Sequence, residues 1–140
     1  MPPDQHAEAA ARLLTAEETG QQCGLLSLAY PGMTLEDAYA VQKALVAQKL
    51  AQGRKKIGWK IGLTSRAMQQ ALNITTPDSG VLLDDMAFET GSTVPAGRFI
   101  QPRVEAEIAF VMKAPLAGAD CPHAALSPIP ICRARRNESG

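Results

Sequence analysis

Residues 102–111 constrain the fold of this chain most, because they carry two acids within an otherwise apolar strand pattern. The side chains of a strand alternate between two faces, so Glu105 and Glu107 share one face, about 7 Å apart along the strand. Apolar residues dominate the rest of both faces: Val104, Ala106, Ile108, Ala109, Phe110 and Val111. The pattern predicts a largely buried strand that presents two carboxylates to an apolar interior.

Two buried carboxylates at this spacing repel each other unless they are protonated or neutralised by a cation. Carboxylate oxygens are ligands that hard cations prefer, and the motif has no thiolate or imidazole. Glu105 and Glu107 therefore predict a site for Mg2+ or Mn2+ rather than for zinc. The alternative is an edge strand with a solvated acidic patch, since glutamate is rarely buried.

A second short strand is predicted around Lys60, where Gly58, Lys60 and Gly62 share one face. Glycines on either side of a lysine leave room for a ligand, and a lysine there is suited to act as an acid, a base or an electrostatic anchor. The alternative is a lysine at the sheet rim that extends to water. Asp78 lies between Pro77 and Ser79-Gly80, which predicts a turn with Asp78 bonding its own backbone.

Three helices are predicted in the first half of the chain. The first runs from Pro3 to about Gln22 and carries a modest apolar stripe. The second starts at a capping box made by Thr34 and Asp37 and ends near Gln52, with a glycine directly after it. A short third helix spans residues 66–72, and a solvated basic corner of residues 54–56 precedes the Lys60 strand.

Several stretches together resemble the hydratase branch of the fumarylacetoacetate hydrolase superfamily, from about Leu25 to about Cys121. The resemblance is carried by residues 28–31, 36–42, 60–65, 82–86 and 98–103, together with the acidic motif. It implies that Glu105 and Glu107 are two of three metal-binding carboxylates, and that Lys60 and Asp78 match the active-site lysine and aspartate. It also implies an α+β fold, with N-terminal helices and part of a mixed β-sheet.

The same resemblance implies a lyase that adds water to an unsaturated 2-oxo diacid in the degradation of aromatic compounds, and a homo-oligomer when intact. Three alternatives stay open: decarboxylation of a related 2-oxo-enedioate, hydrolysis of an acylpyruvate, or a non-catalytic remnant. The expected organisation is an N-terminal helical region over residues 1–55, a partial catalytic domain over 56–121 and a divergent tail over 122–140.

The tail departs from the family pattern after about Cys121. It carries prolines and three arginines without helical or strand periodicity, which predicts an out-of-frame or truncated end, or else a disordered basic tail. The third acidic ligand of the family has no counterpart in this sequence. The 140-residue chain alone is therefore expected to lack hydratase activity and to fold poorly.

Composition excludes other classes of function. Fourteen basic and fourteen acidic residues cancel, so the chain lacks the positive charge typical of nucleic-acid binding. Apolar runs are too short to span a membrane and the N-terminus lacks a signal pattern, which predicts a cytoplasmic protein. Three widely spaced cysteines argue against a disulfide framework, and Cys121, His123 and Cys132 fit no standard zinc spacing.

Overall fold

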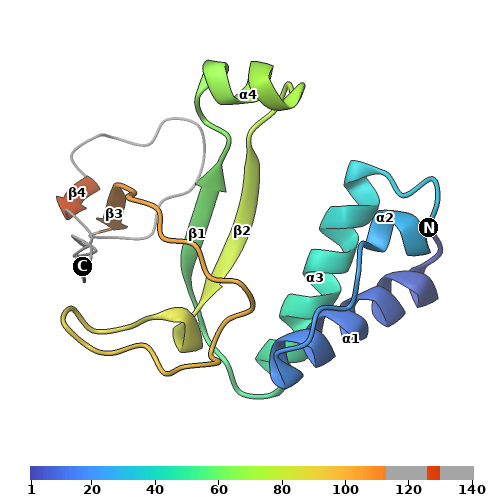
Figure 1. The fold of residues 1–140 in the computed structure, drawn as a ribbon, viewed down its shortest axis with the longest axis horizontal. Helices are drawn as coiled ribbons and strands as arrows, with labels where there is room; N and C mark the ends of the chain where they lie inside the picture. Colours follow the sequence, from blue (N-terminus) through green and yellow to red (C-terminus); the bar gives the residue numbers. More distant parts are fainter. Residues whose placement is uncertain (113–125, 130–140) are drawn as a thin grey trace, which may run out of the picture. The chain divides into compact units, whose positions relative to one another are not determined.

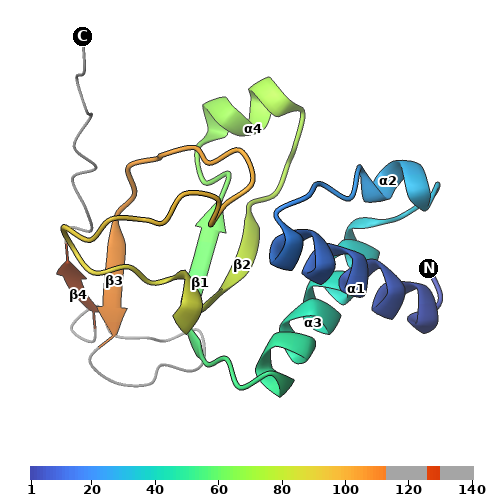
Figure 2. The same ribbon diagram turned by 60° about the horizontal axis from the view of Figure 1, so that its bottom comes forward.

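The computed structural model describes residues 1–112 and 126–129, which fall into two compact units, Met1–Ile100 and a second unit that starts at Gln101. In the first unit, helices gather beside a two-stranded antiparallel ribbon, as Figures 1 and 2 show. The elements of the first unit, in chain order, are α1 (Pro3–Thr19), α2 (Leu26–Ala29), α3 (Leu35–Ala51), β1 (Lys56–Gly62), α4 (Arg66–Leu72), β2 (Asp78–Leu83) and the short 3-10 helix η1 (Asp84–Met86).

The core of the helical part lies where α1 packs against α3 (Figure 2). Ala9 and Ala10 of α1 and Val41 of α3 are buried there, and the two alanines allow the helices to approach closely. Partly buried apolar residues surround this centre: Met1, Leu13, Leu26, Tyr30, Met33, Ala44 and Leu45. The predicted apolar stripe of the first helix is thus confirmed, and small side chains make up its centre.

The ends of α1 and α3 follow local sequence signals. α1 stops at Gly20, whose φ of 69° lies in the left-handed region that glycine adopts without strain. At the start of α3, Thr34 Oγ1 accepts a bond from the Asp37 amide, and the Asp37 carboxylate accepts one from the Thr34 amide. Gly53 follows α3 with a φ of 91°. The predicted capping box and glycine stop are both confirmed.

Asp37 also joins α3 to the start of the chain. Its Oδ1 lies 2.7 Å from the Met1 ammonium and 2.8 Å from Nε2 of His6. Those contacts and the Thr34 amide favour the ionised form, with the ammonium contributing most, so the pKa of Asp37 lies well below its ordinary value. Only 8% of this residue is exposed, so its charge is satisfied within the fold.

The strands β1 and β2 form an antiparallel ribbon, and α4 lies in the connection between them (Figure 1). Ser65 caps α4 by accepting a bond from the Met68 amide at 3.4 Å, and Asn73 ends the helix in the left-handed region. Both the predicted bounds of this helix and the predicted strand around Lys60 are confirmed. Leu83 at the end of β2 is buried, which anchors the base of the ribbon.

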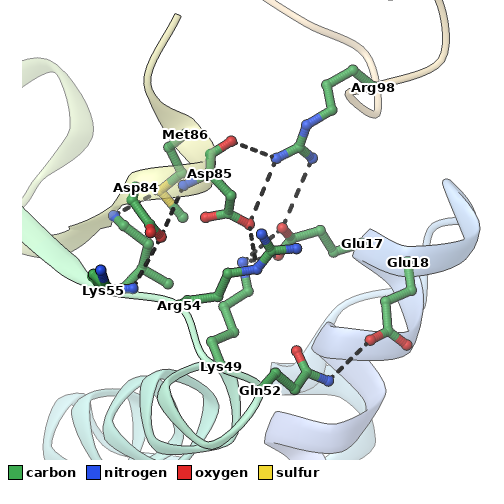
Figure 3. A network of polar contacts seen from close by, with 11 residues as sticks. Glu17, Glu18, Lys49, Gln52, Arg54, Lys55, Asp84, Asp85, Met86 and Arg98 are labelled. Carbon is green, nitrogen blue, oxygen red and sulfur yellow. Dashed lines mark hydrogen bonds and ion pairs between the residues drawn. The ribbon is translucent and has the colours of Figure 1, made fainter.

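A network of charged groups ties that base to the helices (Figure 3). Lys49 of α3 is 4% exposed and its Nζ lies 2.6 Å from Glu17 of α1. Arg98 donates to the main-chain oxygen of Asp85 at 3.0 Å and lies 3.9 Å from the Glu17 carboxylate. A buried lysine is rarely found without a partner, and the Lys49–Glu17 contact neutralises this charge where α1 meets α3.

The basic corner of residues 54–56 is exposed, as predicted, but its residues also make specific contacts. Arg54 Nε lies 3.5 Å from Asp85 Oδ2, and Lys56 Nζ lies 4.5 Å from the centre of the Trp59 ring. The Lys55 amide donates to Asp84 at 2.9 Å, and this bond is the main reason that the pKa of Asp84 is lowered.

The second unit corrects the prediction for the acidic segment. Its strands, β3 (Ala109–Met112) and β4 (Leu126–Ile129), pair antiparallel over four residues. Residues 102–108 form no strand, and Val104 and Ile108 are 78% and 77% exposed. Alternation alone does not make a strand, because the backbone also needs a partner, and no described strand pairs with residues 102–108. The prediction of a buried strand there is wrong for the described structure.

The α+β class is confirmed, and both described strand pairs are antiparallel. β4 lies in the segment for which the sequence predicts no regular structure, so this strand was missed. Residues 113–125 and 130–140, including Cys121, His123 and Cys132, lie outside the described residues. The division into residues 1–55, 56–121 and 122–140 stays a prediction. In the described part of the chain, no helix is long and apolar enough to cross a membrane.

The Asp37 network predicts how stability depends on pH. The folded pKa of Asp37 lies below that of the unfolded chain, which is about 3.9, so its stabilisation is present above that pH and is lost as the pH falls. Asp37→Asn should remove this part of the acid dependence when the free energy of unfolding is measured in urea across the acid range. Asp4→Asn, an exposed change in α1, is the control. An unchanged acid dependence in Asp37→Asn would contradict the prediction.

Candidate functional site

The pairing of β1 with β2 places the predicted lysine and aspartate on one face. Lys60 lies opposite Gly80 and Gly62 lies opposite Asp78. Paired residues of an antiparallel ribbon point to the same face, and so do residues two apart along each strand. Lys60 and Asp78 are therefore diagonal neighbours on one face of the ribbon.

Three glycines share this face with Lys60 and Asp78: Gly58, Gly62 and Gly80. At Gly80, directly opposite Lys60, an added Cβ would meet no atom within 4 Å. At Gly62 an added Cβ would collide with Oδ1 of Asp78, so the missing side chain makes space for this carboxylate. The prediction that glycines leave room beside Lys60 is supported at Gly80, whereas the space at Gly62 is filled by Asp78.

Asp78 begins a strand rather than lying in a turn, so the predicted turn is corrected. Its pairing with Gly62 extends the ribbon to the residue directly after Pro77. The next residue, Ser79, is held from the other side by α3, where Gln42 Nε2 donates to its main-chain oxygen at 2.9 Å. Tertiary pairing thus overrides the local turn preference of the Pro-Asp-Ser-Gly sequence.

Sequence reasoning did not single out Tyr39 and Gln42, which contact the residue next to Asp78. The Ser79 amide donates to the Tyr39 hydroxyl oxygen at 3.2 Å. Tyr39 and Gln42 are three residues apart on a helix and so lie on the same face. The only available signal was their position within residues 36–42, one of the stretches that carry the family resemblance.

Glu105 and Glu107 lie in the second unit, in the segment that precedes β3, and both are exposed. Each has carboxylate oxygens of the kind that Mg2+ or Mn2+ binds. Among residues 1–112 and 126–129, no cluster of three or more histidine, cysteine, aspartate or glutamate side chains has the arrangement of a metal site. The described structure therefore contains two predicted ligands without a complete metal site.

A hollow of about 710 Å3 lies elsewhere in the first unit, and neither Lys60 nor Asp78 lines it. Its lining is mostly apolar and includes Leu13, Leu25, Met86 and Phe99. Its two charged residues, Glu17 and Arg98, belong to the network of Figure 3. Size alone does not make an active site, and the ribbon face has the groups suited to chemistry.

Comparison with known proteins shows extensive similarity to enzymes that act on 2-oxo acids. The chain is 53% identical over 116 residues to a 2-oxo-hept-4-ene-1,7-dioate hydratase of Escherichia coli, covering 83% of this chain and 43% of the relative. It is 43% identical over 112 residues to a 2-keto-4-pentenoate hydratase of Paraburkholderia xenovorans, covering 80% and 42%. No family model matches the sequence.

The similar solved structures agree with this result. A 4-oxalocrotonate decarboxylase of Pseudomonas putida G7, complexed with magnesium and adipate, matches with a TM-score of 0.83 and 35% identity, covering 91% of this chain and 51% of that one. The chain thus spans less than half the length of the curated relatives above and about half of this structure. The predicted resemblance to the hydratase branch of the fumarylacetoacetate hydrolase superfamily is confirmed.

The contact between Gly62 and Asp78 generates a test. Gly62→Ala should force the Asp78 carboxylate to turn away from β1, because the new Cβ and Oδ1 cannot occupy the same space. The NMR resonance of the Asp78 carboxyl carbon should shift. Gly58→Ala is the matched control on the same face, since its nearest neighbour would be Leu82 at an ordinary 3.9 Å. Equal shifts in the two variants would contradict the assigned contact.

Proposed function

Because the chain resembles 2-oxo acid hydratases over most of its length, we propose that it contributes catalytic and metal-binding residues to a metal-dependent hydratase. The substrate we propose is an unsaturated 2-oxo diacid of the 2-oxohept-4-ene-1,7-dioate type, formed when homoprotocatechuate is degraded. The observation that carries this proposal is 53% identity to a hydratase of that substrate, together with a lysine and an aspartate on one open face.

In this proposal, Glu105 and Glu107 hold Mg2+ or Mn2+ through carboxylate oxygens. A structural neighbour that was solved with magnesium and the diacid adipate supports a divalent cation and a dicarboxylate ligand. When bound, such a cation stabilises the negative charge that develops on the 2-oxo oxygen of the substrate. The remaining ligands would come from the substrate, from water or from protein outside the described residues.

Lys60 supplies positive charge on the ribbon face, next to the open space at Gly80. There it would stabilise either the developing enolate charge or the carboxylate of the substrate, without needing to give up its proton. Asp78 is the candidate for proton transfer, because addition of water requires one proton to leave the water and one to reach carbon. The shared face keeps both side chains near one bound substrate.

Decarboxylation of a related 2-oxo-enedioate is the second candidate. It is favoured by the similarity to the solved decarboxylase described above. Both reactions proceed through the same kind of enolate, so Lys60 and the two glutamates would serve either one. The reaction product distinguishes them.

The whole protein is also proposed to form a homo-oligomer. On the face of the ribbon opposite Lys60, Trp59 and Ile61 are 53% and 52% exposed. Exposed apolar residues that lie together are typical of surfaces that further protein covers.

The test of function is a chimera in which residues 1–112 of this chain replace the matching part of the Escherichia coli hydratase. Incubated with Mg2+ and 2-oxohept-4-ene-1,7-dioate, it should form a product that has gained one water molecule. Release of carbon dioxide from 4-oxalocrotonate, supplied in a parallel incubation, would favour the decarboxylase instead. A folded chimera that performs neither reaction would contradict the enzymatic proposal. The 140-residue chain assayed alone should show no turnover, because it covers only 43% of the length of that hydratase.

Lys60→Ala in this chimera should lower turnover on the order of a hundredfold or more, since it removes a positive charge near the developing anion. Lys56→Ala, in the same strand, is the control and should keep turnover close to that of the parent chimera. Unchanged turnover in Lys60→Ala would remove the lysine from the mechanism.

Replacing a metal-binding carboxylate by an amide should weaken cation binding. Glu105→Gln and Glu107→Gln in the chimera should each reduce Mg2+ affinity by about tenfold or more, as measured by calorimetry. Glu89→Gln, an exposed change before the second unit, should leave Mg2+ affinity unaltered. Undiminished affinity in both variants would overturn the ligand assignment.

A further inference from the structure

The main chain of Ser79 is held entirely by side chains of α3. Its N–H donates to the Tyr39 hydroxyl oxygen at 3.2 Å, and its carbonyl oxygen accepts from Gln42 Nε2 at 2.9 Å. Residues of an antiparallel strand direct both polar groups either toward the partner strand or away from it. Ser79 lies opposite Ile61, and its two bonds to α3 show that these groups point away from β1.

This arrangement reaches Asp78 directly, because Ser79 follows it in the chain. Fixing the Ser79 N–H fixes the peptide plane that joins these two residues, and with it the position of the Asp78 Cα. The pairing of Asp78 with Gly62 then restrains the direction of the Cα–Cβ bond. From the other strand, Gly62 leaves the space that the Asp78 carboxylate occupies. The bonds from α3 to Ser79 and the space left by Gly62 therefore both determine where the Asp78 carboxylate lies.

The contact also borders a small hollow of about 210 Å3. It is lined by Leu35, Ala38, Tyr39, Gln42, Asp78 and Ser79. A hollow of this size is large enough for water molecules. Asp78 is thus constrained by its neighbours and still open to water, which is what a proton-transfer group in a hydration reaction needs.

We propose that Tyr39 and Gln42 are positioning residues. Through hydrogen bonds to both main-chain polar groups of Ser79, they hold the Asp78 carboxylate next to Gly62, on the same face of the ribbon as Lys60. This inference rests on the proposed function for its catalytic meaning, but the positional effect is independent of turnover. It gives the N-terminal helices a part in building the site. Neither residue is required to contact the substrate.

A purely structural role makes a different prediction. The outer edge of β2 would otherwise expose unpaired polar groups, and two side chains of α3 could serve only to cover that edge. In that case their removal would lower stability while the Asp78 carboxylate stayed in place. A positioning role instead requires that the Asp78 carboxylate moves when the hydrogen bonds from Tyr39 and Gln42 to Ser79 are lost.

The test uses NMR on the chimera described above, which carries residues 1–112 of this chain, so it does not depend on turnover. Tyr39→Phe removes only the hydroxyl that accepts from Ser79, and Gln42→Met removes the donating amide without adding a charge. In each variant the resonance of the Asp78 carboxyl carbon should shift. In Tyr39→Phe, hydrogen exchange of the Ser79 amide should also accelerate about tenfold or more, because its acceptor is lost.

Two control variants match these changes. Tyr30→Phe removes a hydroxyl that has no hydrogen-bond partner among the described residues, and Gln48→Met makes the same amide-to-thioether change elsewhere on α3. Both should leave the Asp78 resonance and the Ser79 exchange rate as in the parent chimera. Thermal unfolding of every variant establishes that the compared proteins are folded.

The outcomes separate the two proposals. An unmoved Asp78 resonance in folded Tyr39→Phe and Gln42→Met would overturn the positioning role, whether or not the chimera is active. A moved resonance, together with a chimera that is inactive, would uphold positioning and contradict the proposed function. If the chimera is active, Tyr39→Phe in it should lower kcat more than it changes KM, because a displaced proton-transfer group affects the reaction rather than substrate binding.

Discussion

The register between β1 and β2 is the constraint on which the rest of the first unit depends. Side chains of a strand alternate with a period of two, so a slip by one residue would send Asp78 to the opposite face from Lys60. With Lys60 opposite Gly80 and Gly62 opposite Asp78, the two candidate catalytic groups share a face with three glycines. Trp59 and Ile61 then occupy the other face.

A two-stranded ribbon is only marginally stable by itself, so contacts at both ends must hold this register. At one end, Leu83 is buried and the charged groups of Figure 3 connect residues after β2 to the helices. At the other end, side chains of α3 form hydrogen bonds with the main chain of Ser79. The helices therefore support the ribbon at both ends.

The sequence predicted best the features that depend on neighbouring residues. The capping box at Thr34, the glycine stop after α3 and the bounds of α4 all follow from local hydrogen bonds and backbone preferences. Prediction from the sequence failed where pairing between distant segments determines the secondary structure. Asp78 joins a strand because Gly62 lies opposite, and residues 102–108 form none because no described strand pairs with them.

The sequence predicted which residue types make up the candidate site. It did not predict the residues that hold them in place. Lys60, Asp78, Glu105 and Glu107 have side chains whose chemistry suggests a role. Tyr39 acts through a backbone amide 40 positions away in the chain, and neither periodicity nor spacing signals such a contact. Long-range hydrogen bonds to main-chain atoms depend on the folded arrangement, so the structure was needed to find them.

The register itself is the central claim, and one NMR measurement tests it most directly. Because Ser79 directs its polar groups toward α3, Ile61 and Ser79 form a pair without mutual hydrogen bonds, in which the two Hα atoms approach closely. This register predicts a strong nuclear Overhauser effect between the Hα atoms of Ile61 and Ser79. A strong effect between Ile61 and either Asp78 or Gly80 instead would place Lys60 and Asp78 on opposite faces and contradict the register.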